Sequence, residues 1–222
     1  MMKPPTAEYR SHPPGGCSGR LGAARRWPEL AALVLLAACS SNPPIADWQL
    51  NAKAASERAV AAYLTGNARI DAAEQSRARS EVARTGRADL LARVELAHCA
   101  AQVASLVFEP CSAFEPLRAD ATDAERAYAD RLAGRSAATE PTALQGITDP
   151  LARLVAAGVL FETNRADPQV IQTAIDTASA QGWRRPLLAW LNVQLKRVEA
   201  AGAPAESEQL RRRIALVQGS VP

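Results

Sequence analysis

The chain has 222 residues, of which 48% are hydrophobic and 22% charged, values that are ordinary for a globular protein and argue against a wholly disordered one. Its formal net charge is +3, but residues 1–38 hold five of the 26 basic and only two of the 23 acidic side chains. The rest of the chain therefore carries 21 of each and is formally neutral, so its charge gives no support to DNA or RNA binding.

The first element in the chain is an uncharged apolar run, residues 30–38, that follows Arg25 and Arg26. A basic stretch before an apolar one is the order found in a secretory signal. As a helix these nine residues would span about 14 Å, roughly half of a bilayer core. The run therefore predicts a removable export signal and not a membrane-spanning anchor.

The apolar run ends in Leu36, Ala37 and Ala38, followed by Cys39. These four residues resemble the lipobox of bacterial lipoproteins, in which the cysteine is acylated and becomes the new N-terminus. The resemblance implies cleavage after Ala38 and acyl chains, such as palmitate, on Cys39 that hold the protein to a membrane. By resemblance to lipoproteins of Gram-negative bacteria, Ser40 implies delivery to the outer membrane, facing the periplasm. The alternative is an apolar stretch that happens to end in cysteine.

These features divide the chain into a signal peptide (1–38), a lipidated tether (39–46) and a helical periplasmic domain (47–222). The tether contains Pro43 and Pro44 among small polar residues, which cannot build a helix.

Two helices are expected directly after the tether. A stripe of small apolar residues at helical spacing begins at Trp48 and ends before Gly66. A polar segment from Asn67 to Thr85 follows and is closed by Gly86, the usual residue just beyond a helix. The pair is typical of a helical hairpin with an outer, solvated helix.

The next helix carries two apolar stripes. One stripe consists of Leu90, Val94, Ala97, Ala101, Ala104 and Phe108. The other consists of Leu96, Cys99, Val103 and Leu106. A helix that is apolar on two sides is expected to lie between neighbours.

Side-chain caps mark three later helices. Thr122 and Glu125 have the spacing of a capping box and predict a helix that runs to about Leu132. Asp149 and Asp167 each precede a proline suited to the first helical position, so a helix is expected to begin at each.

The remainder of the chain is expected to form a loop and a final helical pair. Residues 135–148 are expected to form a loop, which either separates two halves or lies within one domain. Pro186 marks the start of a helix over 186–201, and a second follows over 204–217. Core-facing positions are Ile171, Ala174, Ile175, Ala178, Leu187, Leu191, Val198, Leu210, Ile214 and Val217.

No segment shows strand-like alternation, and helix breakers recur about every 20 residues. We therefore expect an all-α fold of stacked antiparallel helical hairpins behind a disordered signal region. Residues 48–108 and 183–217 resemble tetratricopeptide-like helical-repeat proteins, which implies an irregular α-solenoid or bundle. The chain lacks the 34-residue self-similarity of that family.

The four cysteines are expected to have different fates. Cys17 leaves with the signal and Cys39 takes lipid, so Cys99 and Cys111 remain. In an oxidising periplasm two such thiols pair, and closing this loop would stabilise the fold by about 3 kcal/mol in the chain-entropy model. The alternatives are two free thiols, or a redox or metal pair that includes His98.

No constellation of residues points to catalysis. His98 is the only histidine after the signal, and its neighbour Cys99 points about 100° away around a helix, so a structural role is expected. No nucleophile elbow, phosphate-binding glycine loop or metal-ligand spacing is present in the sequence, and we expect no metal or cofactor. Four acidic residues fit caps and solvated faces better than a calcium loop or paired acids: Glu115, Asp120, Asp123 and Asp130.

Basic and aromatic residues of the last third have two interpretations each. The basic residues are Arg184, Arg185, Lys196, Arg197, Arg211, Arg212 and Arg213. They form a solvated helix face or a docking patch for an acidic partner or lipid head groups. Trp183 and Trp190 are expected in the core rather than in a ligand clamp, because a break at Pro186 is expected between them. Trp48 near the tether could meet the membrane interface.

The sequence thus predicts a lipid-anchored envelope protein that binds another envelope protein and does not act as an enzyme. The alternatives are a cell-envelope hydrolase that uses acidic residues, and a structural spacer.

Overall fold

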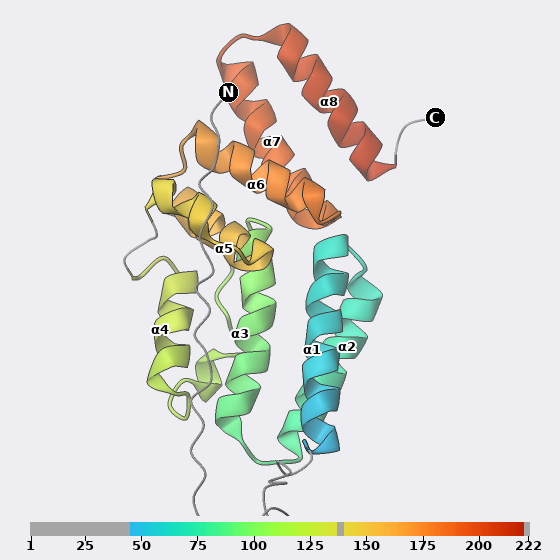
Figure 1. Cartoon of the computed structure of the whole chain (residues 1–222), viewed down its shortest axis with the longest axis vertical. Coiled ribbons are helices and arrows are strands. Elements are labelled where there is room, and N and C mark those ends of the chain that lie inside the picture. Colours follow the sequence, from blue (N-terminus) through green and yellow to red (C-terminus); the bar gives the residue numbers. More distant parts are fainter. Residues whose placement is uncertain (1–44, 137–139, 220–222) are drawn as a thin grey trace, which may run out of the picture. The chain divides into compact units, whose positions relative to one another are not determined.

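The computed structural model describes residues 45–136 and 140–219. The expected signal, its cleavage residues Leu36, Ala37 and Ala38, and the expected lipid site Cys39 lie outside these residues. Within them the chain is all-helical, as predicted, with eight α-helices, two short 3-10 helices and no strand (Figure 1).

Helices α1 (Asp47–Thr65) and α2 (Ala68–Ala83) form the predicted hairpin. Gly66 ends α1 with a left-handed φ of 86°, and the side chain of Asn67 accepts a hydrogen bond from the Ile70 amide to start α2. The two helices lie side by side (Figure 1) because the side chains between them are small. The buried residues of this hairpin are mostly alanines: Ala52, Ala55, Ala59, Ala62 and Ala78.

Helix α3 (Ala88–Ala104) packs against α1, α2, α4 (Asp123–Leu132) and α5 (Pro150–Glu162), and against the 3-10 helix η1 (Glu115–Leu117). Its expected position between neighbours is therefore confirmed. The helix is shorter than the stripes predicted, because Leu106 takes a φ of 60° and turns the chain. Phe108 consequently lies in the loop, where its ring stacks on Phe161 with centroids 6.3 Å apart.

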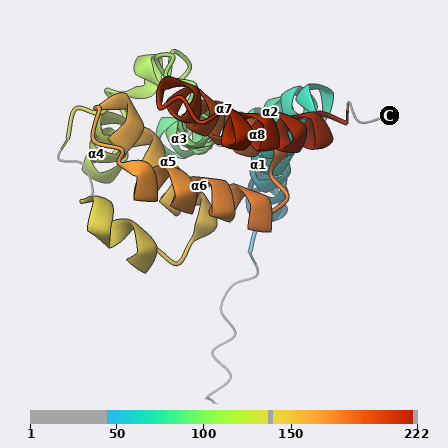
Figure 2. The same ribbon diagram turned by 90° about the horizontal axis from the view of Figure 1, so that it is seen from above.

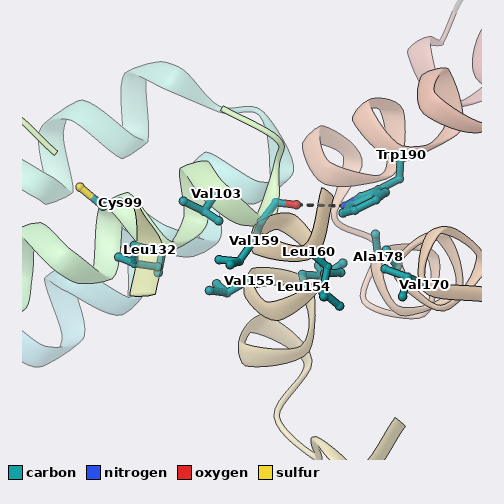
Figure 3. Close-up of a cluster of buried hydrophobic side chains, with 14 of the residues drawn as sticks. Cys99, Val103, Leu132, Leu154, Val155, Val159, Leu160, Val170, Ala178 and Trp190 are labelled. Atoms are coloured by element: carbon teal, nitrogen blue, oxygen red, sulfur yellow. Dashed lines mark hydrogen bonds between the residues drawn. The ribbon is translucent and has the colours of Figure 1, made fainter. Parts of the chain in front are cut away.

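Helices α3 and α5 approach closely at a glycine. Gly158 is buried within α5, and a Cβ atom there would overlap the carbonyl oxygen of Val103 and lie 3.1 Å from its carbonyl carbon. This contact lets the two helices share one core, which includes Leu154, Leu160 and, from α3, Val103 (Figure 3).

The predicted caps are confirmed. Thr122 and Glu125 form a complete capping box at α4. Asp149 accepts a hydrogen bond of 2.7 Å from the Ala152 amide at α5. Asp167 likewise caps α6 (Pro168–Ala180).

Two predictions in the second half were wrong in detail. Helix α7 (Arg184–Ala200) begins two residues before Pro186 and continues through Trp190, so the break expected at Pro186 is absent. Pro186 sits in the first turn, where an amide has no helical partner in any case. The expected loop 135–148 contains a 3-10 helix, η2 (Pro141–Gly146), anchored by the buried Leu144.

Helices α5, α6, α7 and α8 (Pro204–Gln218) pack each on the next (Figure 2). Eight of the predicted core positions are buried: Ile171, Ala174, Ile175, Ala178, Leu187, Leu191, Val198 and Ile214. Leu210 and Val217 are partly buried against the core. The same core includes residues of α3 and α4, so packing continues across the 135–148 segment.

Candidate functional site

A disulfide joins Cys99 of α3 to Cys111 of the loop that follows it. The two Cα atoms are 5.9 Å apart, a separation that disulfides normally have. The bond holds the loop against the helix it has just left, as the sequence predicted.

A cavity of about 160 Å³ lies beside this disulfide. Its walls are formed by Val103, Phe108, Glu109, Pro110, Cys111, Glu115, Ala129, Leu132, Ala133, Arg135 and Glu162. Seven apolar residues, three glutamates and one arginine thus line the same space.

Two of these carboxyl groups have pKa values shifted in opposite directions. Glu162 has a buried Oε2 atom without a hydrogen-bond partner among the described residues, and burial raises the pKa of this carboxyl. Glu115 accepts a hydrogen bond of 2.9 Å from Arg118, which lowers its pKa. The sequence analysis missed Glu162, since a glutamate in the last turn of a helix has no distinctive signal.

A second feature lies nearer the start of α3, where two grooves meet at Arg93. One groove, of about 460 Å³, is lined by Trp48, Gln49, Ala52, Lys53, Ser56, Glu57, Val82, Arg87, Leu90, Arg93 and Val94. The other, of about 430 Å³, is lined by Arg93, Leu96, Ala97, Ala100, Thr122, Ala124, Glu125, Tyr128 and Leu151. Together they make an apolar strip along α3, which we call the α3 groove.

Arg93 is held in the middle of the α3 groove by Glu125. Its Nε donates a hydrogen bond of 2.5 Å to the nearly buried Glu125 carboxylate, while 61% of the Arg93 side chain stays exposed. Burial by itself raises the pKa of Glu125, but the hydrogen bonds from Arg93 and Thr122 outweigh it, so the pKa lies below 4.5. The middle of the groove is therefore an ion pair whose guanidinium stays largely exposed between two apolar halves.

His98 has a structural environment, as expected. Its Nε2 lies 3.0 Å from Oδ1 of Asp71, and its ring meets that of Tyr63 edge to face at 5.2 Å. These contacts join α3 to both helices of the hairpin, and Cys99 beside it is engaged in the disulfide.

The basic residues of the last third serve partly as internal links, which the sequence analysis did not foresee. Arg185 donates a hydrogen bond of 2.8 Å to the Tyr63 carbonyl, and its guanidinium lies 4.2 Å from the centre of the Tyr63 ring. It thereby binds a carbonyl group near the C-terminal end of α1 and links that end to α7. Arg211 donates to Glu199 at 2.6 Å.

The two tryptophans of the last third do not form a clamp. Trp190 is fully buried, as predicted, and its indole N–H donates to the Ala104 carbonyl at 3.2 Å (Figure 3). Trp183 is the partly buried residue that precedes α7.

The expected acidic residues mostly form ion pairs. Asp130 binds both Arg118 and Arg135, and Asp123 binds Arg126. Asp120 is exposed. Within residues 45–136 and 140–219, no group of three or more His, Cys, Asp or Glu side chains is arranged to hold a metal ion. In those same ranges no helix combines the length and the apolar character needed to cross a bilayer.

Comparison with known proteins gives no relative: neither a protein-family model, nor a curated protein, nor a solved structure matches the chain. Its function must therefore be argued from its own residues.

Proposed function

We propose that the chain is a bacterial envelope protein anchored by lipid at Cys39, whose helical domain binds another envelope protein in the α3 groove. The proposed location rests on the order of Arg25 and Arg26, the apolar run 30–38 and Cys39 in the sequence. The binding role is carried by one observation, the two apolar grooves that meet at Arg93.

The groove suits an amphipathic segment. Leu90 and Val94 line one half and Leu96 and Ala97 the other, so apolar side chains recur along a helix length. A partner helix binds such a surface by its own apolar face. Arg93 has five N–H donors in all, and its exposed part is available to a carboxylate at the centre of the partner's face. We therefore expect a partner helix with an acidic residue flanked by apolar ones.

The location is tested by intact mass and membrane fractionation of the protein made in a Gram-negative envelope, beside Cys39→Ala. We expect an acylated product that starts at Cys39 in the membrane fraction, and loss of both properties in the variant. Soluble, unacylated wild-type protein would overturn the proposed anchor.

The groove is tested by a photo-crosslinking residue at Ala97, with the same residue at the exposed Leu216 as the matched control. We expect a crosslink to one envelope protein from position 97 alone, abolished by Leu90→Glu, which adds a charge to the other half of the groove. Equal crosslinking from both positions, or persistence in Leu90→Glu, would contradict binding in this groove.

A second candidate function, hydrolysis by paired acids, is favoured by the cavity beside the disulfide. Glu162, with its raised pKa, is suited to donate a proton, and Glu115 to remain ionised. The test is turnover of cell-wall fragments by Glu162→Gln, with the exposed Glu208→Gln as the control. Loss of turnover in Glu162→Gln alone would support the hydrolase function. Absence of turnover by the wild type would refute it.

A further inference from the structure

The start of α1 carries apolar side chains that the domain does not cover. Large exposed apolar residues of the described chain include Ile45 and Leu50, with 62% and 52% of their surface accessible. Trp48, between them, is only partly buried and lines the α3 groove. Two aliphatic side chains and a tryptophan thus surround the start of one helix, on different sides of it.

The position of these residues in the chain limits where they can lie. Ile45 is six residues after Cys39, a distance that a fully extended chain spans with at most about 22 Å. Helix α1 has 19 residues and is therefore about 28 Å long. If Cys39 carries acyl chains in a membrane, the first turn of α1 lies near that membrane, whichever way the domain turns.

The opposite end of α1 is tied to a different part of the domain. Arg185 of α7 binds the Tyr63 carbonyl close to the last turn of α1, and α8 packs on α7. Helices α7 and α8 thus belong to the end of α1 that is distant from Ile45. The domain therefore has a tether end and a far end.

We propose that Ile45, Trp48 and Leu50 form a lipid-contacting edge that lies in the headgroup region of the membrane and orients the domain. This inference rests on the proposed anchorage at Cys39. Tryptophan prefers this region because its ring is apolar and its N–H is polar, and neighbouring aliphatic side chains enter the acyl boundary. The edge gives the domain a second contact with the membrane, in addition to the acyl chains on Cys39, and directs α7 and α8 away from the bilayer.

Charge contributes little to this contact. Lys53 and Arg87 lie in the same groove as Trp48, but each has an acidic partner, Glu57 at 3.7 Å and Asp89 at 2.5 Å. Because these charges are compensated locally, the edge is held by apolar burial, and its contact with lipid is insensitive to salt.

The experiment measures tryptophan fluorescence of the acylated protein in vesicles of phosphatidylethanolamine and phosphatidylglycerol, with and without brominated lipid. Trp48, Trp183 and Trp190 are the tryptophans that follow Cys39, so the difference between wild type and Trp48→Phe isolates the first. We expect bromine near the headgroup to quench the Trp48 signal, equally at low and high salt. Ile45→Ser with Leu50→Ser should reduce that quenching.

The matched control is Trp48→Phe with Leu216→Trp, which moves the probe to an exposed site on α8. That tryptophan should escape quenching. Acylated protein that floats with vesicles but shows no more quenching at Trp48 than at position 216 would overturn the lipid-contacting edge. Failure to acylate or to float would instead refute the anchor itself, so the two failures are distinguishable.

Discussion

The close approach of α3 and α5 gives the sharpest prediction. In Gly158→Ala, the new methyl group would meet Val103, whose carbonyl carbon lies 3.1 Å and whose Cγ1 lies 3.0 Å from the position that the added carbon takes. Both are below ordinary contact distance, and the clash with the carbonyl oxygen is with backbone, so rotation of a side chain cannot relieve it. The two helices must move apart or the substituted turn must distort.

The magnitude follows from two opposing effects. Alanine favours a helix over glycine by about 1 kcal/mol. Overpacking a filled core costs about 1–3 kcal/mol and more where the backbone must yield. The interface also loses contacts elsewhere as α3 and α5 separate, because Val103, Leu154 and Leu160 belong to one core. We expect a net loss of about 2 kcal/mol in the free energy of unfolding, or about 4–8 °C in Tm for a domain of this size.

The assay is urea and thermal unfolding followed by far-ultraviolet circular dichroism. Gly146→Ala is the matched control, because Gly146 is exposed and a Cβ atom there meets nothing within 4 Å. We expect the control to unfold as the wild type does. A Gly158→Ala protein as stable as the wild type would refute the argument that this helix contact requires a glycine.

Three further predictions use the same unfolding assay. Trp190→Phe removes the donor to the end of α3 and part of a fully buried ring, and should lower the free energy of unfolding by about 2 kcal/mol; a variant as stable as the wild type would contradict this role. Replacing Cys99 and Cys111 by alanine should lower it by about 3 kcal/mol, and reductant should then have no further effect. Because the pKa of Glu125 is lowered by Arg93, its stabilisation is present above pH 4.5 and is lost as the pH falls through the lower folded value. Glu125→Gln should flatten that part of the pH profile, and an unchanged slope would contradict the assignment.

Local sequence signals predicted most helix boundaries, because caps act within a few residues. Thr122 with Glu125, Asp149 and Asp167 each fix a helix start through hydrogen bonds to nearby amides. The start of α7 was misplaced because a proline is compatible with any position of the first turn, so Pro186 could not show that the helix begins at Arg184.

The contacts that join distant helices were not predictable in this way. Arg185 is one of several basic residues in the sequence, and only the fold brings it to the Tyr63 carbonyl. Gly158 and Glu162 likewise gain their roles from Val103 and the cavity, which lie far away in the chain. The disulfide was predictable, because the expected compartment and the count of cysteines left few partners.

The alanine interface between α1 and α2 has a consequence for motion. Each buried methyl group removes little apolar surface from water, so the hairpin gains less from burial than the leucine-rich helices around α5. Regions with little apolar burial open locally at a free energy below that of global unfolding. We therefore expect the amide protons of α1 and α2 to exchange with solvent as one cooperative unit before those of α5. Truncating Arg185, which fastens α1 to α7, should make that opening more frequent.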